Sequence, residues 1–87
     1  MIRYRIYTEN VNYEETLILA KSHLGDAFTV FHAVGFYDGK EEKSLVFEVL
    51  LATESDEPMH FAYYVKKQNK QESVFVTREP DIGCFNV

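Results

Sequence analysis

The chain has 87 residues and a formal net charge of −5 at pH 7. This length suits one domain, and a composition of 46% apolar and 15% aromatic residues excludes a disordered segment. The single cysteine, Cys84, excludes an internal disulfide, and no apolar run approaches the roughly 20 residues that span a bilayer. We therefore expect a cytoplasmic protein without a membrane partner, and the acidic balance argues against a nucleic-acid partner.

The first part of the chain predicts a strand followed by a helix. Apolar and polar residues alternate over 2–8, as in a strand with one buried face. Asn12 is a good N-cap for the helix, and Glu15 stands three residues later in the spacing of a capping box. Gly25 suits the end of this helix, because glycine tolerates the left-handed conformation common there.

The middle of the chain predicts a hairpin of two strands. A run dense in Phe, Val and Ala covers 27–37 and has apolar residues on both of its faces. Asp38-Gly39 follows as a strong turn signal, and apolar residues then alternate over 44–51. The two strands are therefore expected to pair antiparallel across this turn.

A second helix and a last strand complete the pattern. Pro58 suits the first turn of a helix that ends near Asn69. A short strand then covers 73–77. The chain is expected to form one domain over 1–79, followed by a C-terminal tail over 80–87.

The order strand-helix-strand-strand-helix-strand is that of a ferredoxin-like α+β sandwich. Because crossover connections are right-handed, both helices are expected on one face of a four-stranded antiparallel sheet with strand order 4-1-3-2. The other face of the sheet is expected to remain open.

This open face is where we expect function or assembly, because it mixes apolar and charged side chains and such a surface is usually covered. Glu48 lies on a central strand next to the strand that carries Arg3 and Arg5, so an ion pair is expected there. The candidate ligand or interface residues on this face are Arg3, Arg5, Tyr7, Glu48, Phe75 and His32. His32 stands on the strand with two apolar faces, so its side chain could instead point into the core.

Two uses of the open face are compatible with the sequence. Seven Phe and six Tyr residues exceed what a small core needs, so some are expected at an interface between copies of the chain in a dimer or trimer. Alternatively, the face lines a pocket between subunits in which an arginine holds an anion.

Residues for catalysis or metal binding form no motif. The three histidines and Cys84 are widely spaced and share no ligand pattern. The four glycines are scattered, so no phosphate-binding loop is expected. We therefore expect no metal, no cofactor and no catalytic residue.

The hairpin resembles that of a known family. The stretch from Gly35 to Glu42, Gly-Phe-Tyr-Asp-Gly-Lys-Glu-Glu, followed by 44–50, resembles the aromatic-x-Gly-Lys-x-Glu hairpin of the CutA proteins, which are relatives of the PII signal-transduction proteins. The resemblance implies a ferredoxin-like subunit of a trimer that acts by binding and not by catalysis. The CutA cysteine of the second strand is absent, so copper binding is not implied. The turn is far shorter than the effector loop of PII proteins, so nucleotide sensing of that kind is not implied either.

A second resemblance concerns the segment 69–74. Short uncharacterised proteins of bacteria and their phages pair such a hairpin with a late Asn-x-Gln-Glu-Ser-Val segment, and this chain has the matching residues Asn69, Gln71, Glu72, Ser73 and Val74. The two resemblances cover about a quarter of the chain.

Three functions follow as hypotheses. The first is a non-catalytic, oligomeric binding or regulatory module. The second is a small enzyme of the dimeric α+β barrel type, in which Arg3 or Arg5 holds an anionic substrate and His32 or Glu48 moves a proton. The third is a phage or mobile-element protein that binds and inhibits a host protein through acidic loops. The loop residues concerned are Glu41, Glu42, Glu54 and Glu57.

Overall fold

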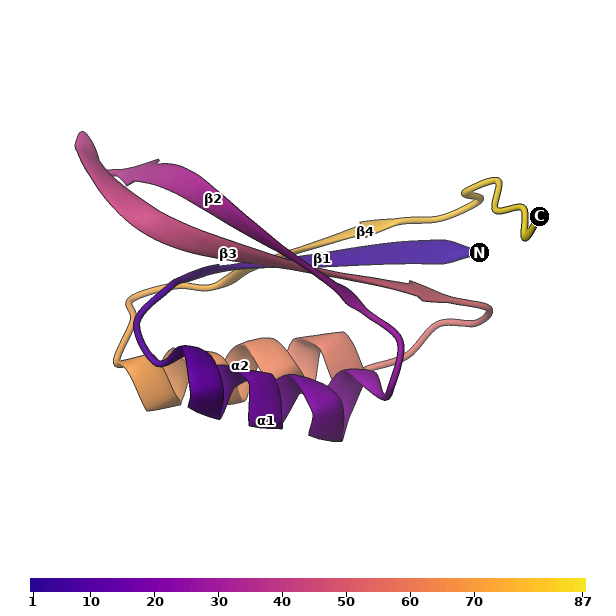
Figure 1. Ribbon diagram of the computed structural model, residues 1–87, viewed down its shortest axis with the longest axis horizontal. Helices are drawn as coiled ribbons and strands as arrows, with labels where there is room; N and C mark the ends of the chain where they lie inside the picture. Colours follow the sequence, from indigo (N-terminus) through magenta and orange to yellow (C-terminus); the bar gives the residue numbers. More distant parts are fainter.

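A computed structural model describes residues 1–87 as a four-stranded sheet with two helices on one face (Figure 1). The elements are β1 (Ile2–Glu9), α1 (Tyr13–Leu24), β2 (Thr29–Tyr37), β3 (Lys40–Leu51), α2 (Glu57–Asn69) and β4 (Phe75–Glu79). The sheet order is β2-β3-β1-β4, with every neighbouring pair antiparallel. This arrangement confirms the predicted ferredoxin-like α+β fold. Neither helix is long and apolar enough to cross a membrane.

The core lies between the helices and the central strands. Ile6 of β1 and Phe47 of β3 face each other across the pair and are fully buried, as their alternation with polar residues predicted. Phe61 of α2 meets Phe47 edge-on, with ring centroids 5.0 Å apart. Val65 is buried one turn further along α2. The helices therefore leave the other face of the sheet uncovered.

The start of α1 differs from the prediction. Asn12 holds the N-cap position, but its side chain makes no capping hydrogen bond, so the predicted capping box with Glu15 is wrong. The Asn12 amide instead donates to Oδ1 of Asn69 at the end of α2, 2.9 Å away. A tertiary partner has replaced the local one. Gly25 does follow the helix with a φ of 83°, as expected for its role at the C-terminal end.

The hairpin is longer than predicted. Asp38 and Gly39 both have positive φ, 53° and 74°, which is the two-residue turn whose twist suits antiparallel strands. This tight turn keeps Lys40 paired with Tyr37, so β3 begins four residues earlier than the predicted start at Ser44. The hairpin projects beyond the helices, and its strands stay paired up to the turn (Figure 1).

The other strand ends also shift. β2 begins at Thr29 rather than at residue 27, and β4 runs over Phe75–Glu79 rather than over 73–77. Past β4, the N–H of Ile82 donates to the carbonyl of Met1 at 2.9 Å, so the segment after the sheet lies beside the first residue. Both chain ends therefore lie at the opposite end of the sheet from the hairpin (Figure 1).

Candidate functional site

A row of four apolar side chains crosses the open face. The strand register places Phe75, Tyr7, Val46 and Phe31 opposite one another on β4, β1, β3 and β2. The rings at the two ends remain accessible, with Phe75 65% and Phe31 45% exposed. The structure thus brings together Tyr7 and Phe75, two of the residues singled out from the sequence, and adds Phe31 to them.

A charged group lies on one side of this row. Nε of Arg5 donates to Oε1 of Glu48 at 2.8 Å, and Arg3 donates to Oε1 of Glu79 on β4 at 2.5 Å. The bond to Glu48 raises the pKa of the Arg5 guanidinium above its usual value, in spite of partial desolvation. Both arginines are therefore engaged by carboxylates of the chain itself, as expected for Glu48.

His32 belongs to the other face of the sheet, which corrects its assignment to the open face. Its register partner on β3 is Leu45, a fully buried core residue. Its ring lies beside Tyr13 of α1, with centroids 5.3 Å apart. The apolar residues on both faces of β2 concealed this orientation. His32 consequently cannot share a pocket on the open face with Glu48.

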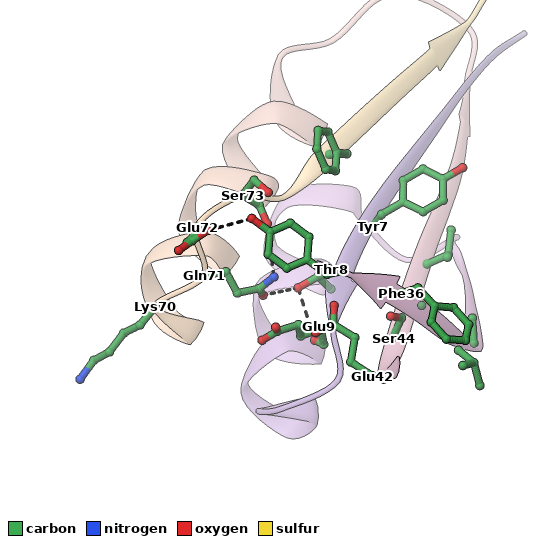
Figure 2. Close-up of a pocket in the computed structure, with 16 residues that line it drawn as sticks. Tyr7, Thr8, Glu9, Phe36, Glu42, Ser44, Lys70, Gln71, Glu72 and Ser73 are labelled. Atoms are coloured by element: carbon green, nitrogen blue, oxygen red, sulfur yellow. Dashed lines mark hydrogen bonds between the residues drawn. The ribbon is translucent and has the colours of Figure 1, made fainter. Parts of the chain in front are cut away.

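A cleft lies on the hairpin side of the apolar row, between the β2–β3 hairpin and the loop that joins α2 to β4. Its volume is about 570 Å³. Three aromatic residues of the open face line it, namely Tyr7, Tyr37 and Phe75, whereas Phe36, also a lining residue, alternates with Tyr37 and belongs to the other face of β2. Figure 2 shows the hairpin residues and the loop residues facing each other across this space.

One hydrogen bond joins the two walls of the cleft. The phenol of Tyr37, at the end of β2, donates to Oε2 of Glu72 in the α2–β4 loop, 2.7 Å away. This bond to a carboxylate, with the nearby negative charge and some desolvation, raises the pKa of the Tyr37 phenol. The two residues lie 35 positions apart in the sequence. Their contact therefore depends on the length and twist of the hairpin.

The cleft carries more negative than positive charge. Glu9, Glu42 and Glu72 line it, against Lys70 as the one basic lining residue. A side-chain hydrogen bond with Glu42 raises the pKa of the Glu9 carboxyl, and partial burial and the charge of Glu42 raise it further. No Lys, Arg or His nitrogen lies within 4.0 Å of any of these carboxylates. The cleft is thus suited to a positively charged group.

Gly35 lies at the floor of the cleft. A Cβ atom at this position would stand 2.5 Å from Oγ of Ser44 on β3, so Ser44 occupies the space that a side chain at position 35 would need. Ser44 and Ala33 also line the cleft, so the floor is built from small side chains while the walls carry the aromatic rings.

Sequence reasoning missed most of this cleft. Tyr37 and Glu42 were part of the CutA-like hairpin and Glu72 was part of the late segment, but no residue-level argument connected them. Glu9 follows the predicted first strand and carried no signal. The resemblances pointed to the right segments without indicating a site between them.

The remaining acidic loop residues are mostly paired within the chain. Glu54 pairs with Arg78, and Glu57 accepts from Nδ1 of His23 at 2.8 Å and lies 3.3 Å from Nδ1 of His60. These two glutamates are therefore less available to a basic partner than the sequence suggested. No group of His, Cys, Asp and Glu side chains is arranged to hold a metal ion.

Comparison with known proteins gives structural neighbours only. No protein-family model matches the sequence, and no curated protein matches it. A phage SAM lyase in its apo state aligns with 90% of this chain and 78% of its own, at 23% identity and a TM-score of 0.60. GlnK of B. subtilis, in a complex with ATP, aligns with 90% of this chain and 81% of its own, at 19% identity and a TM-score of 0.50. At these identities the likeness shows the shared fold.

Proposed function

We propose that this chain is a small ligand-binding subunit whose open-face cleft takes an adenosine-containing cation, with S-adenosylmethionine (SAM) as the ligand that suits it best. The observation that carries the proposal is the combination of aromatic walls and unpaired carboxylates in one cleft. In this proposal carboxylates and aromatic rings hold a cation, whereas the site predicted from the sequence used an arginine to hold an anion.

The size and walls of the cleft suit a nucleoside. Pockets for small ligands commonly enclose about 300–1,000 Å³, a range that includes the volume of about 570 Å³ found here. Stacking of a base on an aromatic ring contributes about 1–3 kcal/mol. Tyr7, Tyr37 and Phe75 offer ring surfaces for such stacking.

The charge of the cleft selects among adenosine ligands. A triphosphate needs basic groups, whereas this lining has three carboxylates and one lysine. SAM has a sulfonium centre, which carboxylates and aromatic ring faces both attract. At about 5 Å and an effective dielectric constant between about 20 and 80, one such charge pair contributes about 1–3 kcal/mol. The cleft should therefore favour SAM over ATP.

The structural neighbours support an adenosine ligand in a general way. One neighbour is a SAM lyase and the other is GlnK in complex with ATP, and both SAM and ATP contain adenosine. We transfer only this shared part to the present chain. The choice of the cation over the triphosphate rests on Glu9, Glu42 and Glu72.

Self-assembly is the second part of the proposal. The apolar row from Phe75 to Phe31 leaves large side chains accessible on a face that no helix covers. The CutA-like hairpin favours a homo-oligomer, and a small domain gains stability by such association. We expect the row to contact a second copy of the chain, as a PII-like regulatory module would.

Cleavage of the bound ligand is a second candidate function. The higher TM-score belongs to the SAM lyase, 0.60 against 0.50. A lyase breaks a bond without adding water, so it can act without an activated nucleophile. The sequence contains no motif for such a nucleophile. In that case the role of the cleft is to hold the ligand in a reactive conformation.

Binding measurements test the proposal. Isothermal titration should give SAM a lower Kd than S-adenosylhomocysteine, which lacks the sulfonium charge, and ATP the highest Kd of the three. Tighter binding of ATP than of SAM, or no saturable binding of any of them at about 1 mM, would refute it. Mass spectrometry of SAM incubated with the protein then separates binding from cleavage.

A matched pair of variants locates the charge effect. Glu42→Gln should bring the Kd for SAM closer to the Kd for ATP, because it removes a carboxylate from the cleft. Glu41→Gln should leave the ratio of these two Kd values unchanged, since Glu41 is paired with Phe36 on the other face of the hairpin and is absent from the lining. An equal effect of both variants would assign the preference to net charge and not to the cleft.

A further inference from the structure

The late segment matched in the sequence forms a chain of side-chain hydrogen bonds beneath the cleft. Oε1 of Gln71 accepts from Oγ1 of Thr8 at 2.5 Å and from Nδ2 of Asn69 at 3.0 Å. The Asn69 Oδ1 in turn accepts from the amides of Asn12 at 2.9 Å and Gln68 at 3.2 Å. The chain of bonds thus connects the end of β1, the start of α1 and the end of α2.

Gln71 lies at the point where this network meets the cleft wall. Lys70 ends α2 in the left-handed conformation, with φ 54° and ψ 41°, and the chain turns there. The backbone N–H of Gln71 donates to the carbonyl of Lys66 at 3.0 Å, and its side chain reaches Thr8, which is only 4% exposed. The next residue, Glu72, does not join this network and instead accepts the hydrogen bond from Tyr37. Figure 2 shows Gln71 beside Thr8 and Glu72 apart from them.

Few hydrogen bonds hold this wall. Residues 72–74 join α2 to β4 and make none of the backbone hydrogen bonds found outside the helices and strands. Val74 packs against the core, but apart from the bond to Tyr37, the side-chain hydrogen bonds that tie this loop to the rest of the chain pass through Gln71. Loss of the Gln71 amide should therefore loosen Glu72 and Ser73 while leaving the packing of Val74, the helices and the sheet intact.

We infer that Gln71 is a positioning residue, whose side-chain amide holds the α2–β4 loop so that Glu72 faces Tyr37 across the cleft. The consequence for ligand binding rests on the proposed function, whereas the positioning itself does not. Gln71 and Thr8 line the cleft themselves, so the pKa of Tyr37, which reports the position of Glu72, separates a positioning role of Gln71 from a direct contact with a ligand. This gives the late segment a physical role in addition to its resemblance.

The test follows the phenol of Tyr37 by NMR of ¹³C-labelled tyrosine during a pH titration, with Tyr37→Phe to assign the signal. In the wild type the pKa of Tyr37 should lie above its usual value because Glu72 accepts its proton in a hydrogen bond. Gln71→Ala should return this pKa toward the usual value, as Glu72→Gln should. Gln68→Ala is the matched control. It also removes two side-chain amide hydrogen bonds, to Thr16 and Asn69, but Gln68 does not line the cleft.

The outcomes separate the two proposals. Positioning is supported when Gln71→Ala moves the Tyr37 pKa and Gln68→Ala does not, and it is overturned when neither variant moves it or both move it equally. Thr8→Val, which is nearly isosteric, should act like Gln71→Ala and replaces it if that variant fails to fold. If the wild type binds SAM, Gln71→Ala should raise its Kd about tenfold and Gln68→Ala less than twofold. If the wild type binds no SAM, the proposed function fails while the pKa result still decides the role of Gln71.

Discussion

Adding bulk to the floor of the cleft should weaken ligand binding while leaving the fold intact, and Gly35→Val is the change that does this. A Cβ at this position would stand 2.5 Å from Oγ of Ser44, whose hydroxyl can rotate away at a cost of about 0.5–1.5 kcal/mol. Replacing glycine within a strand raises the free energy of unfolding by about 0.5–1 kcal/mol, because glycine loses the most conformational freedom on folding. The two terms nearly cancel. For a domain of this size the Tm should then change by no more than about 8 °C.

The effect on the ligand should be much larger than the effect on stability. The side chain introduced by Gly35→Val would push Oγ of Ser44 aside and add bulk to the floor of the cleft, so a nucleoside bound there would lose contact area. We expect the Kd for SAM to rise at least about tenfold, which corresponds to about 1.4 kcal/mol. Isothermal titration measures the Kd, and circular dichroism on heating measures the Tm.

Thr29→Ile provides the control for this experiment. Thr29 lies on the same face of β2, opposite Glu48, but outside the lining of the cleft. The added bulk should leave the Kd unchanged. An unchanged Kd in Gly35→Val, or an equal loss of affinity in Thr29→Ile, would refute the assignment of the ligand to this cleft.

Three further predictions concern the core, the open face and the helix ends. Phe47→Ala should cost about 3–5 kcal/mol in urea unfolding, because Phe47 is fully buried, whereas Phe85→Ala at an 87% exposed position should cost almost nothing. Val46→Lys should shift the protein toward the monomer in light scattering, since it places a charge in the middle of the apolar row; an unchanged oligomer would exclude that row as the interface. Hydrogen bonds from two histidines lower the pKa of Glu57, so its contribution to stability is present above the ordinary pKa of 4.5 and is lost as the pH falls through the lowered value. The stability difference between wild type and Glu57→Gln should thus be largest well above pH 4.5 and shrink as the pH falls through the lowered pKa, and a difference that grows toward low pH would contradict this assignment.

The sequence was sufficient for the fold because local signals and burial agreed along most of the chain. Alternation in β1 and β3 placed Ile6 and Phe47 on the buried face, and Asp38-Gly39 indicated the hairpin. The order of elements then left one sheet topology. Errors arose where a tertiary contact overruled a local preference, as when Asn12 bonded to Asn69 instead of capping its own helix.

The cleft could not be predicted for a related reason. Its walls come from Tyr37 and Glu72, and no local pattern reports that a hairpin will reach a loop 35 residues further along the chain. The side of β2 that faces the helices depends on its register with Leu45, which a strand with two apolar faces does not reveal. The sequence therefore left two orientations open for His32, and the candidate pocket was expected beside the arginines.

The sign of the charge is what separates the predicted site from the observed cleft. An arginine that held an anion was the sharper of the two hypotheses for the open face. In the structure Arg3 and Arg5 are matched by Glu48 and Glu79, so that part of the face is neutralised within the chain. No basic side chain pairs with the carboxylates of the cleft, where Glu72 accepts from Tyr37 and Glu9 lies against Glu42. Under the proposed function a sulfonium ligand would bring a positive charge to these carboxylates, whereas a triphosphate would add negative charge beside them. The relative affinity for SAM and ATP is therefore the measurement on which the proposal depends.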